Sequence, residues 1–134
     1  MTKTFPARRD ELDAVLGFVE EALEQVGCPV KTQMELNVCV EEVFINIASY
    51  AYPNREGTAE IRVESDADAS SVSISLVDSG VPFDPLQKKD PDVSLSAEER
   101  GIGGLGIYMV KKMTDEVTYE YRDGCNVLTM KKTF

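Results

Sequence analysis

The 134-residue chain contains no histidine. This absence excludes catalysis by a histidine acid or base, metal sites with histidine ligands and autophosphorylation on histidine. The chain has only three cysteines, which are widely spaced and form no C-x-x-C pair: Cys28, Cys39 and Cys125. A disulfide framework or a zinc site is therefore not expected. We expect reduced thiols that pack as small apolar side chains.

The chain also has little that would suit a membrane or a nucleic acid. It lacks an apolar run of about 18 residues or more, and its start lacks the apolar core of a signal peptide. We therefore expect a cytoplasmic protein. The net charge of −10 argues against nucleic acid and anionic membrane surfaces as partners. A basic protein partner would suit this charge, although an acidic surface more often reflects solubility alone.

Hydrophobic periodicity predicts three helices and five strands. Residues 10–26 carry apolar side chains at helical spacing, and Gly27 supplies a stop. Thr32 and Glu35 have the spacing of a capping box, which predicts that a second helix begins there and runs to about Tyr52. A third helix is expected over residues 105–113. The expected strands are 2–5, 58–65, 70–77, 117–121 and 127–131.

The order of these elements predicts the fold class. Helices come first and strands follow, with one helix inserted, which favours an α+β fold over alternating βαβ units. We expect a two-layer sandwich, with a mixed sheet covered on one face by helices, as one domain over residues 1–134. Residues 79–101 are rich in proline and charge and have no clear periodicity. A loop this long is usually functional and often a lid.

Two polar residues lie within the apolar second helix. Glu42 and Asn46 are four residues apart, so they share one face of the helix. An asparagine oxygen suits Mg²⁺, and a neighbouring glutamate can deprotonate a hydroxyl group. Alternatively, both side chains face solvent in a polar stripe with Glu35 and Ser49. The motif is short, and taken alone it favours this second interpretation.

A second candidate feature follows the apolar strand at 70–77. Asp78 can accept a hydrogen bond from an exocyclic amine, and Gly80 would let a flat ring approach the backbone. Aspartate, serine and glycine are also ordinary turn residues. Taken alone, the segment from Asp78 to Gly80 is more simply interpreted as a turn.

A glycine-rich stretch, Gly101-Ile102-Gly103-Gly104-Leu105-Gly106, directly precedes the third helix. Bare backbone N–H groups at a helix N-terminus form a phosphate site. The string also matches the dinucleotide fingerprint, but no strand precedes it. A P-loop is excluded because no Gly-Lys-Ser/Thr follows, and a protein-kinase glycine loop is excluded because its catalytic loop needs histidine.

The order of the three features resembles the GHKL (Bergerat-fold) ATPases, and within them the small anti-sigma-factor serine kinases. The resemblance covers nearly the whole chain. Residues 41–46 (EEVFIN) match the N box, residues 78–85 (DSGVPFDP) the adenine-binding box, and residues 103–108 (GGLGIY) the second glycine box. Residues 113–117 are similar to the family's junction between helix and strand. The implied fold is a histidine-kinase-like ATP-binding domain with an ATP lid at residues 84–103.

The resemblance implies a role for each matched position. Asn46 would hold Mg²⁺, Glu42 would act as the general base, and Asp78 would bind the adenine amine with Gly80 leaving room for the ring. The implied phosphate contacts are Arg100, Gly101, Gly103, Gly104, Leu105 and Gly106. Three positions depart from the pattern: Pro82, Tyr50 and the segment 124–127, which lacks the Gly-Thr-Thr run of the last box. We assign no residue to the polar contact near adenine that this run supplies.

The implied function is an ATP- and Mg²⁺-dependent protein serine kinase. By resemblance it would phosphorylate a STAS-type antagonist and sequester a sigma factor, and a homodimer is compatible with the family. The alternative is an ATP-responsive switch that binds a regulator without transferring phosphate. The detached ATP-binding half of a histidine kinase is a weaker interpretation, because it needs a separate phosphoacceptor and dimerisation domain.

Overall fold

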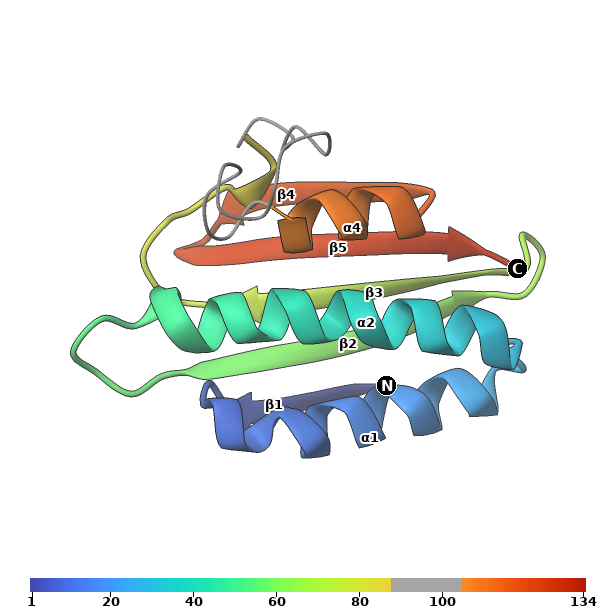
Figure 1. Cartoon of the computed structure of the whole chain (residues 1–134), viewed down its shortest axis with the longest axis horizontal. Helices are drawn as coiled ribbons and strands as arrows, with labels where there is room; N and C mark the ends of the chain where they lie inside the picture. Colours follow the sequence, from blue (N-terminus) through green and yellow to red (C-terminus); the bar gives the residue numbers. More distant parts are fainter. Residues whose placement is uncertain (88–104) are drawn as a thin grey trace.

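The computed structural model describes residues 1–87 and 105–134, which form one sheet and a layer of helices (Figure 1). The strands are β1 (Thr2–Pro6), β2 (Thr58–Asp66), β3 (Ser71–Asp78), β4 (Glu116–Arg122) and β5 (Cys125–Thr133). The α-helices are α1 (Leu12–Gln25), α2 (Val30–Asn46) and α4 (Leu105–Met113). Two short 3₁₀ turns, η1 (Arg9–Glu11) and η3 (Pro85–Gln87), and a π-helix, η2 (Ile47–Ala51), complete the description.

The strands lie in the order β1-β2-β3-β5-β4, and every neighbouring pair is antiparallel. The predicted α+β class is confirmed, but the sheet is fully antiparallel where a mixed sheet was expected. β3 and β4 do run in the same direction, as strands joined by a helical crossover do, yet β5 separates them. The chain returns from β4 through a hairpin at Asp123 and Gly124, whose φ angles are 55° and 78°.

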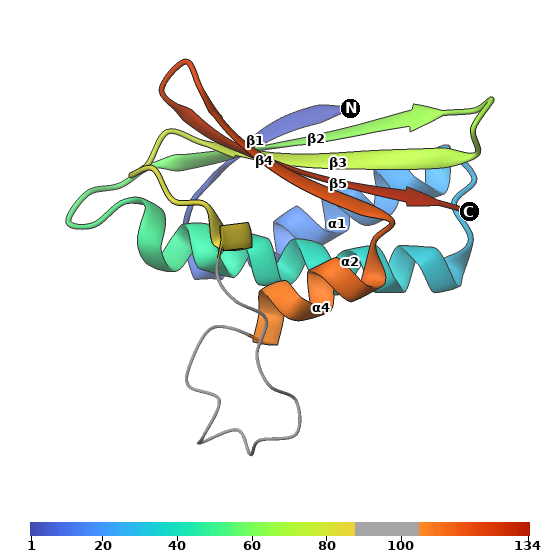
Figure 2. The same ribbon diagram turned by 90° about the horizontal axis from the view of Figure 1, so that it is seen from above.

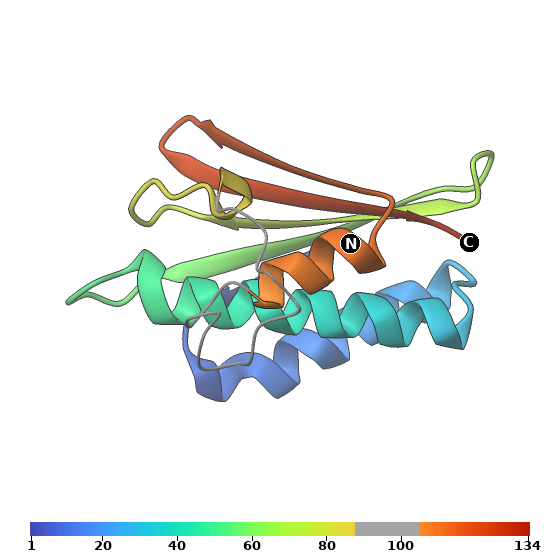
Figure 3. The same ribbon diagram turned by 45° about the horizontal axis from the view of Figure 1, so that its top comes forward.

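The helices cover one face of the sheet, as the view from above shows (Figure 2), and α2 lies between α1 and α4 (Figure 3). Alternate strand residues point to the helices and are buried, because successive side chains of a strand face opposite ways. These include Ala59, Ile61 and Val63 on β2 and Val72, Ile74 and Leu76 on β3, which share one core with Val19, Leu36 and Phe44. The other sheet face is mainly polar, with a 2.9 Å hydrogen bond between Ser75 Oγ and Thr129 Oγ1 and one pair of valines, Val77 and Val127.

The ends of the first two helices differ in how well the sequence predicts them. α1 closes as predicted at Gly27 (φ 76°): the N–H groups of Gly27 and Cys28 donate to the carbonyls of Glu24 and Leu23, which is a Schellman motif. The capping box was wrong, since α2 begins at Val30 after Pro29 with no side-chain cap. A proline φ of −60° already suits a helix start, so the N-cap is Pro29, three residues before the predicted cap at Thr32. Glu35 instead lies 3.6 Å from Lys132 Nζ.

None of the helices that the structure describes has both the length and the apolar character needed to cross a bilayer.

The predicted second helix changes geometry before its end. Its last turn, Ile47–Ala51, is a π-helix rather than a continuation of the α-helix. Such single turns are often found beside functional sites.

Candidate functional site

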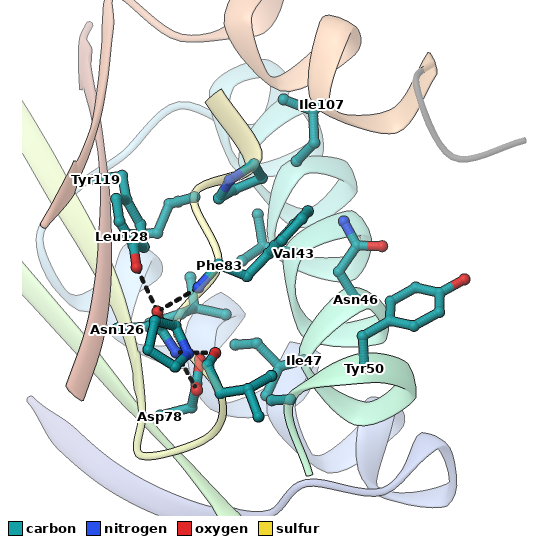
Figure 4. Close-up of a pocket in the computed structure, with 15 residues that line it drawn as sticks. Val43, Asn46, Ile47, Tyr50, Asp78, Phe83, Ile107, Tyr119, Asn126 and Leu128 are labelled. Carbon is teal, nitrogen blue, oxygen red and sulfur yellow. Dashed lines mark hydrogen bonds between the residues drawn. The ribbon is translucent and has the colours of Figure 1, made fainter. Parts of the chain in front are cut away.

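A pocket of about 310 Å³ opens between the helical layer and one end of the sheet (Figure 4). Residues of α2, η2, β3, β4, β5, α4 and the segment after β3 line it. Its walls are mainly apolar or aromatic, and they comprise Val43, Ile47, Tyr50, Ala51, Leu76, Val81, Pro82, Phe83, Pro85, Ile107, Tyr119 and Leu128. The remaining lining residues are polar: Asn46, Asp78 and Asn126. An apolar pocket with few polar groups is typical of a site for a small flat molecule.

Asp78 ends β3 and lines the pocket while remaining only 6% exposed. Its Oδ1 atom accepts two hydrogen bonds of 2.9 Å, from the Gly80 N–H and from Asn126 Nδ2. A buried carboxylate is costly unless hydrogen bonds compensate its lost hydration. Both bonds use the same oxygen, and in the described part of the chain Oδ2 takes part in neither.

Asn126 is the polar residue at this site that the sequence interpretation missed. It lies directly opposite Asp78 in the antiparallel register of β3 and β5 and is 7% exposed. A detectable signal existed, because Asn126 alternates with Leu128 and Met130 on the inward face of β5. An asparagine among buried apolar residues of a strand needs hydrogen-bond partners. The family pattern had left no residue assigned in this last segment.

Tyr119 completes the polar end of the pocket. Its hydroxyl donates to Asn126 Oδ1. Burial raises the pKa of the Tyr119 hydroxyl above its ordinary value, so the group keeps its proton and acts as the donor. The Phe83 N–H donates to the same oxygen over 3.1 Å, which ties the segment after β3 to β5.

Asn46 and Glu42, predicted to share a helix face, lie in different surroundings. Asn46 is the last residue of α2 and lines the pocket beside η2. Glu42 does not line it but packs against the start of α4: a Cβ built on Gly106 would lie 2.2 Å from Glu42 Oε2. Both are half-buried, so the interpretation as a solvent-facing stripe does not describe them. Ser49 of that stripe accepts a 2.8 Å bond from Arg9.

Gly80 makes room for Ala51 in η2. A Cβ at Gly80 would lie 2.2 Å from the Ala51 carbonyl oxygen, and the next residue, Val81, donates its N–H to that oxygen over 2.9 Å. The glycine thus lets the segment after β3 dock on η2 while its own N–H holds Asp78. A direct contact with a ligand ring remains a prediction.

Several predicted positions lie outside the described residues: Arg100, Gly101, Gly103 and Gly104. The same holds for most of the predicted lid at 84–103, of which only residues 84–87 are described. Leu105 is the first residue of α4, and Gly106 follows it. The N-terminal turn of α4 therefore lies beside Glu42, at the end of the site away from Asp78.

Comparison with known proteins now identifies the family. The family described as the histidine kinase-like ATPase domain matches residues 5–132. This chain belongs to that family. Serine/threonine-protein kinase BtrW of Bordetella bronchiseptica is 28% identical over 100 residues, which cover 75% of this chain and 70% of that protein. Serine-protein kinase RsbW of Listeria monocytogenes is 29% identical over 119 residues, which cover 86% and 69%.

A solved structure shares the fold. The histidine kinase domain of the blue-light activated histidine kinase EL346 from Erythrobacter litoralis superposes with a TM-score of 0.59 at 17% identity. The match covers 90% of this chain and 60% of that one. At this identity the likeness supports the fold alone, and it agrees with the antiparallel sheet and the covering helices.

Proposed function

We propose that the pocket binds the adenine of ATP and that the chain is an ATP-dependent protein serine kinase. The observation that carries this is the buried Asp78, whose Oδ1 is held by two donors and whose Oδ2 is left for a ligand. An adenine amine would donate to Oδ2, whereas guanine presents a carbonyl oxygen at that position. The apolar walls would cover the faces of the ring.

The phosphate chain would extend from this end toward the start of α4. Asn46 fits a magnesium site, because it lines the pocket with an amide that can offer an oxygen ligand, and the phosphates can supply further oxygen ligands. When bound, the ion would neutralise charge on the phosphates. The N-terminal turn of α4 would offer its N–H groups to them. The contacts from Arg100, Gly101, Gly103 and Gly104 stay predictions.

Glu42 is the candidate base for transfer. In this proposal the serine oxygen of a protein substrate attacks the γ-phosphorus, and the bond to the β–γ bridging oxygen breaks to release ADP. Glu42 takes the proton from the serine hydroxyl. Its carboxylate reaches Gly106 in the first turn of α4, where the proposal places the phosphates. Positioning and charge neutralisation would supply most of the rate enhancement.

The protein substrate and partners rest on the relatives. Both relatives are named as serine or serine/threonine kinases, which supports serine as the acceptor. By the family resemblance, we propose a STAS-type antagonist as the substrate, a sigma factor as the sequestered partner, and the cytoplasm as the location. The net charge of −10 suits a partner with a basic surface. A homodimer is also part of this proposal.

The alternative is a switch that binds ATP and a regulator without transferring phosphate. One observation favours it: Glu42 packs against Gly106 instead of lining the pocket. A carboxylate held there could simply stabilise the positive end of the α4 dipole.

Incubation of the protein with Mg²⁺ and γ-labelled ATP distinguishes the kinase from the switch. STAS-type proteins from the same genome are added as acceptors, and the label is mapped by mass spectrometry. Label on a serine of one acceptor is expected. Saturable ATP binding without label on any acceptor would instead establish the switch, and the absence of ATP binding would contradict both.

A further inference from the structure

The hydrogen bonds of Asn126 use the whole capacity of its amide. Its Nδ2 donates to Asp78 Oδ1 over 2.9 Å and to the Val81 carbonyl over 3.0 Å. Its Oδ1 accepts from the Phe83 N–H and from the Tyr119 hydroxyl. An asparagine side chain has two donors and two acceptor lone pairs, so no capacity is left for a ligand. Figure 4 shows these bonds converging on the one side chain.

This saturation also fixes the orientation of the amide. A flipped side chain would turn its oxygen toward two acceptors, Asp78 Oδ1 and the Val81 carbonyl, and its NH₂ toward the Phe83 N–H, which is a donor. These three contacts would become repulsive together, and the Tyr119 hydroxyl alone could turn to accept. The donor edge of Asn126 is therefore locked onto Asp78 by partners from β4 and from the segment after β3. Residues locked in this way preorganise a site before any ligand arrives.

We infer that Asn126 is a positioning residue that sets the selectivity of the pocket for a 6-aminopurine by holding Asp78 with Oδ2 toward the ligand. The inference rests on the proposed ATP site and gives a role to a residue of the segment 124–127, where the sequence departs from the family pattern. Asn126 touches no ligand in this scheme. It acts through Asp78, whose Oδ1 loses one of its two donors when Asn126 is changed.

The test compares ATP with the purine ribonucleoside triphosphate that lacks the 6-amino group. Because the phosphates are identical, the ratio of the two affinities reports the base contact alone. Wild type is expected to prefer ATP by roughly tenfold to a hundredfold, the worth of a hydrogen bond to a charged group. If Asn126 had only a general structural role, its substitution would weaken the binding of both nucleotides equally and leave the affinity ratio unchanged.

The sharpest variant is Asn126→Asp, which keeps Oδ1 for Phe83 and Tyr119 but places a second carboxylate against Asp78. The expected result at pH 8.5 is a preference for ATP that falls to threefold or less, on the order of the loss of one oriented charged acceptor. Lowering the pH toward 6 should restore part of the preference, because one of two adjacent carboxyls then takes a proton and becomes a donor. The other titratable groups nearby, Tyr119, Tyr121 and Asp84, are unchanged in the variant.

The matched control is Asn54→Asp, which adds the same charge at an exposed turn with a φ of 63°. It should keep the wild-type ratio at each pH. If Asn126→Asp does not fold, Asn126→Ser, which has one donor for the two acceptors, should also lower the ratio. A folded Asn126 variant with the wild-type ratio would overturn the inference. A wild-type protein that binds both nucleotides equally would instead contradict the proposed adenine site itself.

Discussion

The two ends of the site are built differently. At the base end, Asp78 and Asn126 are 6% and 7% exposed and share a network that reaches β3, β5, β4 and the segment after β3. At the phosphate end, Asn46 and Glu42 are half-buried side chains on one helix, and Glu42 meets α4 at Gly106. Under the proposed function, the base would be recognised by a buried hydrogen-bond network, and transfer would take place where two helices meet.

The contrast predicts different responses to mutation. Changes at the base end should alter which nucleotide binds, since the network leaves one acceptor in one orientation. Changes at the phosphate end should alter what happens to a nucleotide that is already bound. The four experiments below test this division, beginning with the largest expected effect.

Glu42→Gln should reduce phosphoryl transfer by roughly 10²–10⁴-fold, the usual contribution of a general base, while ATP affinity stays near that of wild type. Labelled transfer to the acceptor and calorimetric binding measure the two quantities. Glu41→Gln, an exposed neighbour with the same charge change, is the control and should leave both unchanged. Equal loss of binding and transfer in Glu42→Gln would break the division between the two ends.

Asp78→Asn should lower the affinity for ATP by roughly tenfold to a hundredfold, because the variant removes the charge from the acceptor that would meet the adenine amine. It should also reduce the preference for ATP over GTP. Asp123→Asn makes the same change at an exposed turn and should bind like wild type. Calorimetry on the three proteins is sufficient, and an unchanged affinity in Asp78→Asn would remove Asp78 from the site.

Asn46→Ala should reduce the Mg²⁺-dependent part of ATP affinity by about tenfold, on the scale of losses seen when metal sites are perturbed. Binding without Mg²⁺ should change little, because the base end is untouched. Titrations with Mg²⁺ and with a chelator give the comparison. The same loss under both conditions would show that Asn46 acts as part of the pocket wall and not as a metal ligand.

Alanine substitutions at Gly80 and Gly106 should lower the free energy of unfolding by different amounts. In Gly80→Ala the new Cβ meets the carbonyl oxygen of Ala51, which is backbone and cannot move alone, so a cost of about 1–3 kcal/mol in unfolding free energy is expected. In Gly106→Ala it meets the flexible end of Glu42, and the higher helix propensity of alanine offsets part of the strain. The change should stay within about 1 kcal/mol, with transfer reduced because Glu42 moves. Chemical denaturation measures the free energy of unfolding of both variants. Equal losses of stability in the two variants would contradict this difference.

The sequence predicted local features better than long-range pairing. Asp78 and the stop at Gly27 depend on neighbouring residues, and both lie where a strand or helix ends. Asn126 meets Asp78 only through the register of β3 and β5, across 48 residues of chain, so the alternation in β5 can place Asn126 on the inward face but no local motif reveals its partner. The antiparallel sheet was missed for the same reason, because the place of β5 between β3 and β4 is a tertiary choice.

The start of α2, and the change of helix type near its end, were missed for different reasons. The sequence offers two possible starts for this helix, a capping box at Thr32 and a proline three residues earlier, and the helix begins after Pro29. Its end changes to the π-helix Ile47–Ala51, whose residues line the pocket and pack against Gly80. Periodicity detects an apolar helical segment but does not distinguish an α-turn from a π-turn.

The most direct test of the account is a pair of calorimetric titrations of the wild-type protein with ATP and with GTP in the presence of Mg²⁺. If Asp78, held by Asn126 and Gly80, receives the adenine amine, ATP should bind more tightly by about tenfold or more. Equal affinities for the two nucleotides, or no saturable binding of ATP, would contradict the central claim that this pocket is built to recognise adenine.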